Sequence, residues 1–158
     1  MAVYVVVIVL LILLLVASFR ALSGGEVLTE DDYRTVLVSL AQFATERRDE
    51  LEAALAPGRP AAESVDPAVE VATGARKKLA GYQQQLSRFA GAPEQLASAR
   101  ALLSAAIEDL GWACRIVEPG SYWDNPGLQD AVTGLRRHAG RCLDEVAALL
   151  ASPATIDA

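Results

Sequence analysis

The sequence predicts an all-α protein in which one N-terminal transmembrane helix precedes an antiparallel, up-down four-helix bundle. Residues 2–19 are uncharged and almost wholly apolar, which is typical of a membrane span. Four later stretches each start with helix-capping residues and stop at proline or glycine. Three of them repeat apolar residues in alternating steps of three and four, and no strand-like alternation competes. Helices of similar length with short connections indicate antiparallel neighbours.

Residues 1–20 are predicted to anchor the chain in a membrane. The eighteen residues 2–19 would span about 27 Å as a helix, close to the hydrocarbon thickness of about 30 Å. A cleavable signal peptide has a basic segment before a shorter apolar core, whereas no Lys or Arg precedes this run. The pattern Val16-Ala17-Ser18 keeps cleavage open as the alternative. Arg20 follows the run, so the positive-inside rule places the remaining chain in the cytoplasm, with the outer side as the alternative.

The predicted layout continues with a linker, the bundle and a tail. The linker, residues 21–28, contains Ser23-Gly24-Gly25, which interrupts any continuous helix. The bundle is predicted over residues 29–152, and residues 153–158 form the tail. Proline and glycine end its four helices in the segments APGRP, AGAP, EPG and SP. The helices begin at capping or first-turn residues, namely Thr29, Asp66 with Pro67, Pro93, and Asp124 or Asn125 with Pro126.

Cys114 and Cys142 are the two cysteines, and both fall on or beside the apolar stripes of their helices. In antiparallel helices Cys114 lies near the membrane-distal end, and Cys142 lies more than two turns closer to the membrane. A disulfide needs Cα atoms within about 7 Å of each other. We therefore expect two free, buried thiols, in agreement with a reducing cytoplasm.

His138 is the only histidine and lies in the segment RRHAGR. Its cationic neighbours disfavour both a protonated imidazole and a bound cation. Di-iron bundles need Glu-x-x-His motifs from two helices, and no CxxC, HExxH or EF-hand loop is present in the sequence. A Ser–His or Cys–His pair would have to use His138, and nothing in the sequence indicates one. The sequence therefore predicts no catalytic residue, no metal site and no cofactor.

Two basic clusters stand out: Arg76-Lys77-Lys78, and the group formed by Arg136, Arg137, His138 and Arg141. Such clusters are mostly solvated helix faces that pair with carboxylates of neighbouring helices. The functional alternative is a contact of Arg136, Arg137 and Arg141 with an anion or an acidic partner. The net charge of −6 disfavours nucleic acid, because that affinity comes mostly from neutralising phosphates.

The segment SYWDNPG, residues 121–127, places Tyr122 and Trp123 in a turn at the predicted membrane-distal tip. Trp112 lies about two turns earlier, on the preceding helix. The three aromatic residues either close the end of the bundle or contact a protein partner, because Trp and Tyr are enriched at interface hot spots. Partner binding through Trp112, Tyr122 and Trp123 is the functional hypothesis.

The predicted function is a non-catalytic, membrane-anchored interaction module: an adaptor, a scaffold or an accessory subunit. It would bind the membrane through residues 2–19 and bind a protein partner, with no nucleic acid. An exported or outward-facing sensor or binding domain, held by an uncleaved signal anchor, is the alternative, and an enzyme with no recognisable motif is the third possibility. The preference for Arg over Lys, with abundant Ala, Gly and Pro, indicates a high-GC bacterial genome. An N-terminal anchor before a helical bundle resembles the layout of LemA-type bacterial membrane proteins, and layout alone implies no function.

Overall fold

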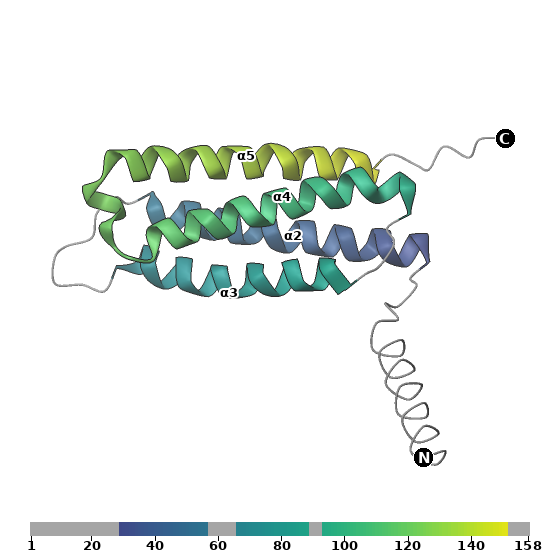
Figure 1. Cartoon of the computed structure of the whole chain (residues 1–158), viewed down its shortest axis with the longest axis horizontal. Coiled ribbons are helices and arrows are strands. Elements are labelled where there is room, and N and C mark those ends of the chain that lie inside the picture. Colours follow the sequence, from purple (N-terminus) through teal and green to yellow (C-terminus); the bar gives the residue numbers. More distant parts are fainter. Residues whose placement is uncertain (1–28, 57–65, 89–92, 152–158) are drawn as a thin grey trace, which may run out of the picture.

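The computed structural model describes residues 29–56, 66–88 and 93–151. Within these residues the regular secondary structure is all helical, with four long helices, one short 3-10 helix and no strand (Figure 1). The predicted all-α fold with four bundle helices is confirmed for this part of the chain. The elements are α2 (Glu30–Leu55), α3 (Pro67–Arg88), α4 (Glu94–Val117), η1 (Ser121–Asp124) and α5 (Pro126–Ala151).

The predicted transmembrane helix is not among these elements. None of the helices in residues 29–56, 66–88 and 93–151 is both long enough and apolar enough to span a bilayer. The predicted anchor (residues 1–20), linker (residues 21–28) and tail (residues 153–158) lie outside the described residues.

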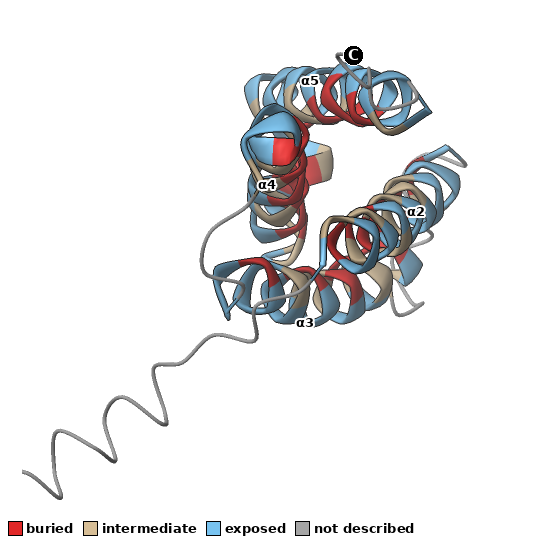
Figure 2. Cartoon of the chain, turned by 90° about the vertical axis from the view of Figure 1, so that its right-hand side faces the viewer, coloured by how far each residue is buried: buried red, intermediate tan, exposed pale blue. Residues whose placement is uncertain are grey.

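Successive helices run in opposite directions along one long axis (Figure 1). The end of the bundle at which α2 begins and α5 ends is called here the proximal end, and the end that carries η1 is called the distal end. Viewed along this axis, the four helices surround a common interior toward which their buried residues face (Figure 2). Helix α4 packs extensively against both α3 and α5, whereas α2 packs more lightly against its neighbours.

Side-chain caps start three of the helices, as the sequence predicts. The Thr29 hydroxyl accepts a hydrogen bond from the Asp32 backbone N–H at 3.2 Å. The Asp66 carboxylate accepts from the Ala68 N–H at 2.9 Å. At α5 the structure selects Asn125 over Asp124, because Asn125 Oδ1 accepts from the N–H of Leu128 at 3.3 Å. These bonds satisfy backbone donors that have no partner inside the helix.

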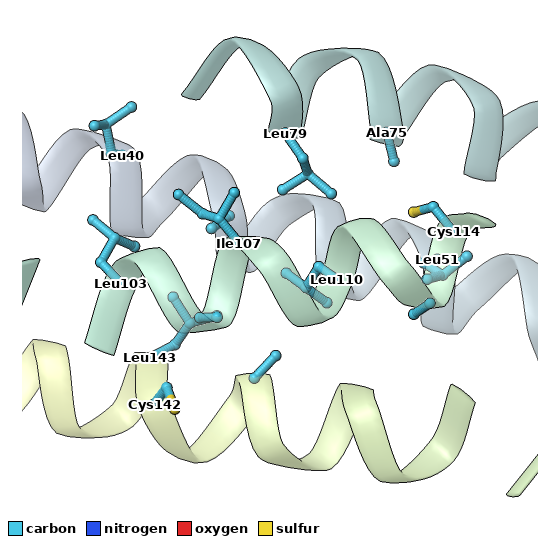
Figure 3. Packing of buried hydrophobic residues seen from close by; sticks show 14 of the residues in the cluster. Leu40, Leu51, Ala75, Leu79, Leu103, Ile107, Leu110, Cys114, Cys142 and Leu143 are labelled. Carbon is cyan, nitrogen blue, oxygen red and sulfur yellow. The ribbon is translucent and has the colours of Figure 1, made fainter. Parts of the chain in front are cut away.

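The core consists mainly of aliphatic and alanine side chains, joined by two tyrosines and two cysteines, and no buried residue in the described ranges is charged. Side chains of α4 meet those of the other three helices in the middle of the bundle (Figure 3). Many of the buried positions are alanine, which lets the helix backbones approach closely. The largest fully buried side chains include Leu37, Leu40, Leu51, Leu79, Leu103, Leu110, Val117, Val132 and Val146.

Both cysteines are buried and free, which confirms the prediction of two separate thiols. Figure 3 shows Cys114 on α4 beside Ala75 of α3, and Cys142 on α5 in another part of the core. Burial is the main cause that raises the pKa of the Cys114 thiol to about 12, and the Glu118 carboxylate adds to it. Cys114 is therefore a neutral core side chain at physiological pH.

Candidate functional site

The two aromatic residues of η1 close the distal end of the bundle. Tyr122 is only 7% exposed and belongs to the core. The Trp123 ring meets the Tyr122 ring edge-on, with centroids 4.9 Å apart. Trp123 Nε1 donates a hydrogen bond to Asp66 Oδ2 at 2.6 Å, so η1 is tied to the start of α3. In this arrangement the same Asp66 carboxylate caps α3 with its other oxygen.

Trp112 is placed apart from these two residues. Its side chain is 49% exposed and lines a groove of about 450 Å³ between α3 and α4, called here the tryptophan groove. The Arg115 guanidinium lies 4.8 Å from the centroid of the Trp112 ring, a cation–π contact that shields one face of the indole. Neither Tyr122 nor Trp123 lines this groove. The three predicted partner-binding aromatics therefore do not form one surface.

Two arginines of the predicted basic site, Arg136 and Arg137, lie beside a third arginine, Arg48, that the sequence did not predict. Arg136 and Arg137 of α5 line a groove of about 280 Å³ that also receives Arg48 from α2. Arg141 does not line it. No sequence signal links Arg48 to the α5 cluster, because the two meet only through the packing of α2 against α5. The complete lining of this arginine groove is Arg48, Glu52, Thr133, Arg136, Arg137 and Gly140.

The three arginines of the arginine groove differ in whether a carboxylate neutralises their charge. Arg136 pairs with Glu52 across the two helices, and Arg48 pairs with its own neighbour Asp49 at 2.9 Å. Arg137 is exposed and has no ion pair within the described residues. Gly140 leaves room for Arg48, since a Cβ at that position would lie 3.3 Å from Arg48 Nη1. The groove thus presents two arginines with internal partners and one whose charge is open to a ligand.

A second groove, of about 550 Å³, lies between the same two helices nearer the proximal end. Its walls are mostly apolar, and Val38 is 47% exposed there. Arg34 Nη1 donates a hydrogen bond to the Leu150 carbonyl at 2.8 Å and so joins α2 to α5 at this end. The lining of this apolar groove is Val38, Ala41, Gln42, Thr45, Glu46, Asp49, Leu143, Ala147, Leu150 and Ala151.

The apolar groove and the arginine groove both lie along the line where α2 and α5 meet, which is called here the α2–α5 seam. The cross-helix contacts of Arg34 with Leu150 and of Glu52 with Arg136 join the helices along it. Between and beside these contacts the seam stays open, apolar toward the proximal end and cationic toward the distal end. A ligand on this seam would meet both chemistries in a fixed order.

His138 belongs to a third arrangement, on the side of α5 that meets α4. Asp109 Oδ2 of α4 lies 2.5 Å from His138 Nδ1, and His138 Nε2 lies 3.9 Å from Cys142 Sγ. The spacing of four residues that brings His138 and Cys142 onto one face of α5 was available in the sequence. The contribution of Asp109 was not, because it comes from another helix.

Comparisons of the chain with models of protein families, with curated proteins and with solved structures gave no match. The function therefore has to follow from the side chains just described.

The Asp109–His138–Cys142 arrangement has the order of groups found in a nucleophile–base–orienter triad, but its thiol is poorly placed for attack. Cys142 is 5% exposed, and none of the grooves described above reaches it. Burial raises the pKa of the Cys142 thiol, with the carboxylates of Asp109 and Glu145 adding to the effect. A reactive thiol instead needs a lowered pKa and access to substrate.

Proposed function

We propose that this chain is a non-catalytic, membrane-anchored interaction module that holds an amphipathic helix of a partner protein in the α2–α5 seam. The observation that carries the proposal is the alignment of the apolar groove and the arginine groove along that seam. The partner helix would have an apolar stripe at one end and acidic side chains at the other.

The apolar groove supports a helical ligand. Its α2 wall is built from positions three and four residues apart, as is its α5 wall at Leu143, Ala147 and Leu150. Two such parallel ridges form the groove into which an amphipathic helix lays its apolar face. Val38 is 47% exposed in the free chain, so a partner side chain placed there would remove apolar surface from water.

The arginine groove supports the acidic end of that ligand and sets its direction. Arg137 has no ion pair with any described residue, and a guanidinium recognises carboxylates through two parallel hydrogen bonds. The acidic end of the partner therefore points toward the distal end of the bundle.

The predicted anchor indicates where in the cell the partner would be found. Residues 2–19 carry the apolar run, and α2 starts only a short distance later along the chain, at Glu30. The apolar groove lies toward the same proximal end, so the partner helix we propose comes from a protein at the membrane. We place the bundle on the cytoplasmic side, following the positive-inside rule. An outward-facing binding domain with the same seam is the rival.

Trp112 is proposed as a second partner contact. It is the most exposed of the three predicted aromatics, and its ring is held by Arg115 rather than by the core. Trp123 and Tyr122 serve the closure of the distal end. A non-catalytic role is supported by the buried, high-pKa Cys142 beside the single histidine.

Site-specific photo-crosslinking in intact cells of the native host tests the proposal. A photoreactive amino acid replaces Ala147, which is exposed and lines the apolar groove, and in a control chain it replaces Lys78, which is exposed on α3. We expect a discrete protein adduct from position 147 and none from position 78. The crosslinked peptide of the partner should be an amphipathic helix with an acidic end. Equal adducts from both positions, or a crosslinked segment without that pattern, would refute the proposal.

A further inference from the structure

We propose that His138 and Cys142 form a two-ligand site for a thiophilic divalent cation such as Zn²⁺, with Asp109 as the residue that positions the imidazole. The site is independent of the α2–α5 seam. It rests on three groups from two helices, joined by His138 Nδ1 to Asp109 at 2.5 Å and by His138 Nε2 to Cys142 Sγ at 3.9 Å.

Asp109 fixes which ring nitrogen of His138 is left for a metal ion. An ionised carboxylate accepts hydrogen bonds but donates none, so the ring nitrogen that faces Asp109, Nδ1, carries a proton and donates it. The lone pair of Nε2 then faces Cys142 Sγ. Metal-binding histidines generally donate their other N–H to a carboxylate or carbonyl in this way. The Asp109 side chain is mostly buried, with 20% of its surface exposed.

The spacing of the two donor atoms fits one metal ion. Zn–S and Zn–N bonds of about 2.3 and 2.0–2.1 Å add to about 4.4 Å, so an ion set off the line between the atoms reaches both. Cys142 Sγ and His138 Nε2 lie 3.9 Å apart in the structure. His138 is 52% exposed, which leaves a path for the ion and room for water at the remaining coordination positions. No group of three or more His, Cys, Asp or Glu residues in the described part of the chain is placed to hold a metal.

The charges around the thiol favour a cation. Asp109 and Glu145 both act on Cys142 with a negative potential, and Arg141 opposes them. The same potential that disfavours a bare thiolate attracts a divalent ion, which displaces the thiol proton when it binds. The arginines next to His138 in the sequence do not undo this, because Arg136 and Arg137 line the arginine groove facing α2.

Cobalt titration of the full-length chain tests the site. The chain is purified in mild detergent with a reductant that does not bind metals, and Co²⁺ is added while thiolate-to-cobalt absorption is followed. We expect a band that saturates at one equivalent and disappears when Zn²⁺ is added. The band should be absent in Cys142→Ser and unchanged in Cys114→Ser, the matched control with a buried thiol but no histidine beside it.

Two further variants keep the result independent of folding defects. His138→Gln changes a half-exposed side chain and should lower the affinity at least tenfold with an unchanged circular dichroism spectrum. Asp109→Asn should weaken binding by about 10–100-fold, the range seen when the hydrogen-bond partner of a metal-bound histidine is changed. The proposal is overturned if the wild-type chain gives no band, if the band survives Cys142→Ser, if His138→Gln leaves the affinity unchanged, or if Cys114→Ser removes the band.

Discussion

Arg136 and Glu52 form an ion pair across the α2–α5 seam, with Arg136 Nη2 2.8 Å from Glu52 Oε2. The two partners differ in their surroundings, because the Arg136 side chain is 18% exposed and the Glu52 side chain is 62% exposed. The arginine is therefore fixed in the seam, whereas the carboxylate can move into water at little cost. Glu52 behaves as an internal counter-ion that an acidic partner could replace.

Glu52→Gln should lower the free energy of unfolding by no more than about 1 kcal/mol, because exposed ion pairs contribute little. Unfolding of the full-length chain in detergent, followed by circular dichroism, measures the change. Arg137→Gln is the control and should stay within about 0.5 kcal/mol of the wild type, since this exposed arginine has no described ion pair. A loss of several kcal/mol for Glu52→Gln would mean that the pair is a structural requirement and not a replaceable counter-ion.

Trp123→Phe should destabilise the distal end by about 1.5–3 kcal/mol, the usual range for a hydrogen bond to a charged group. The substitution keeps an aromatic ring but removes the Nε1–H that donates to Asp66 Oδ2 at 2.6 Å. Asp66→Ala should cost more, because it also removes the cap of α3. Unfolding of both single variants and the double variant gives the coupling energy. If their effects simply add, the two side chains do not interact in solution.

The stability of the chain should fall at alkaline pH because of Cys114. Its pKa is about 12 in the folded chain, against an ordinary value near 9.0. Between these values the unfolded thiol ionises and the folded thiol does not. The stabilisation is therefore complete below pH 9 and is lost as the pH rises toward 12, at about 1.4 kcal/mol per pH unit. The free energy of unfolding, measured from pH 8 to pH 11, should fall more steeply for the wild type than for Cys114→Ala. Parallel curves would contradict the burial of this thiol.

Gly134→Ala and Gly140→Ala should differ although both lie in α5. A Cβ at Gly134 meets nothing within 4 Å, so alanine should stabilise the chain by about 0.5–1 kcal/mol through helix propensity. A Cβ at Gly140 comes within 3.3 Å of Arg48 Nη1, so the arginine has to shift and the gain should be smaller. Thermal unfolding of the two variants makes the comparison. An equal gain in stability from the two variants would show that the position of the Arg48 side chain does not require a glycine at position 140.

The local part of the fold was open to prediction from the sequence. Caps at Thr29, Asp66 and Asn125 act through hydrogen bonds within a few residues, so they can be predicted without knowledge of tertiary contacts. The apolar repeats likewise indicate which face of each helix is buried. The burial of Cys114 and Cys142 followed from the same repeats.

The candidate site depends on contacts between helices, which periodicity does not specify. An apolar stripe says which face is inside, but not which neighbour flanks it on either side. Arg48 joins Arg136 and Arg137 only because α2 packs beside α5. Asp109 reaches His138 only because α4 packs against the other side of α5. Tyr122 could have faced solvent or core on its sequence alone, and the position of η1 across the end of the bundle turned it inward.

Charge reversal in the seam tests the central claim most directly. Arg137 and Arg141 lie one turn apart on α5 and are both exposed, but only Arg137 lines the arginine groove. Each is changed to glutamate in the chain that carries the photoreactive residue at position 147, and the partner adduct is quantified in cells. We predict that Arg137→Glu lowers the yield at least tenfold and that Arg141→Glu leaves it unchanged. Equal yields from the two variants would contradict an acidic partner helix in the α2–α5 seam.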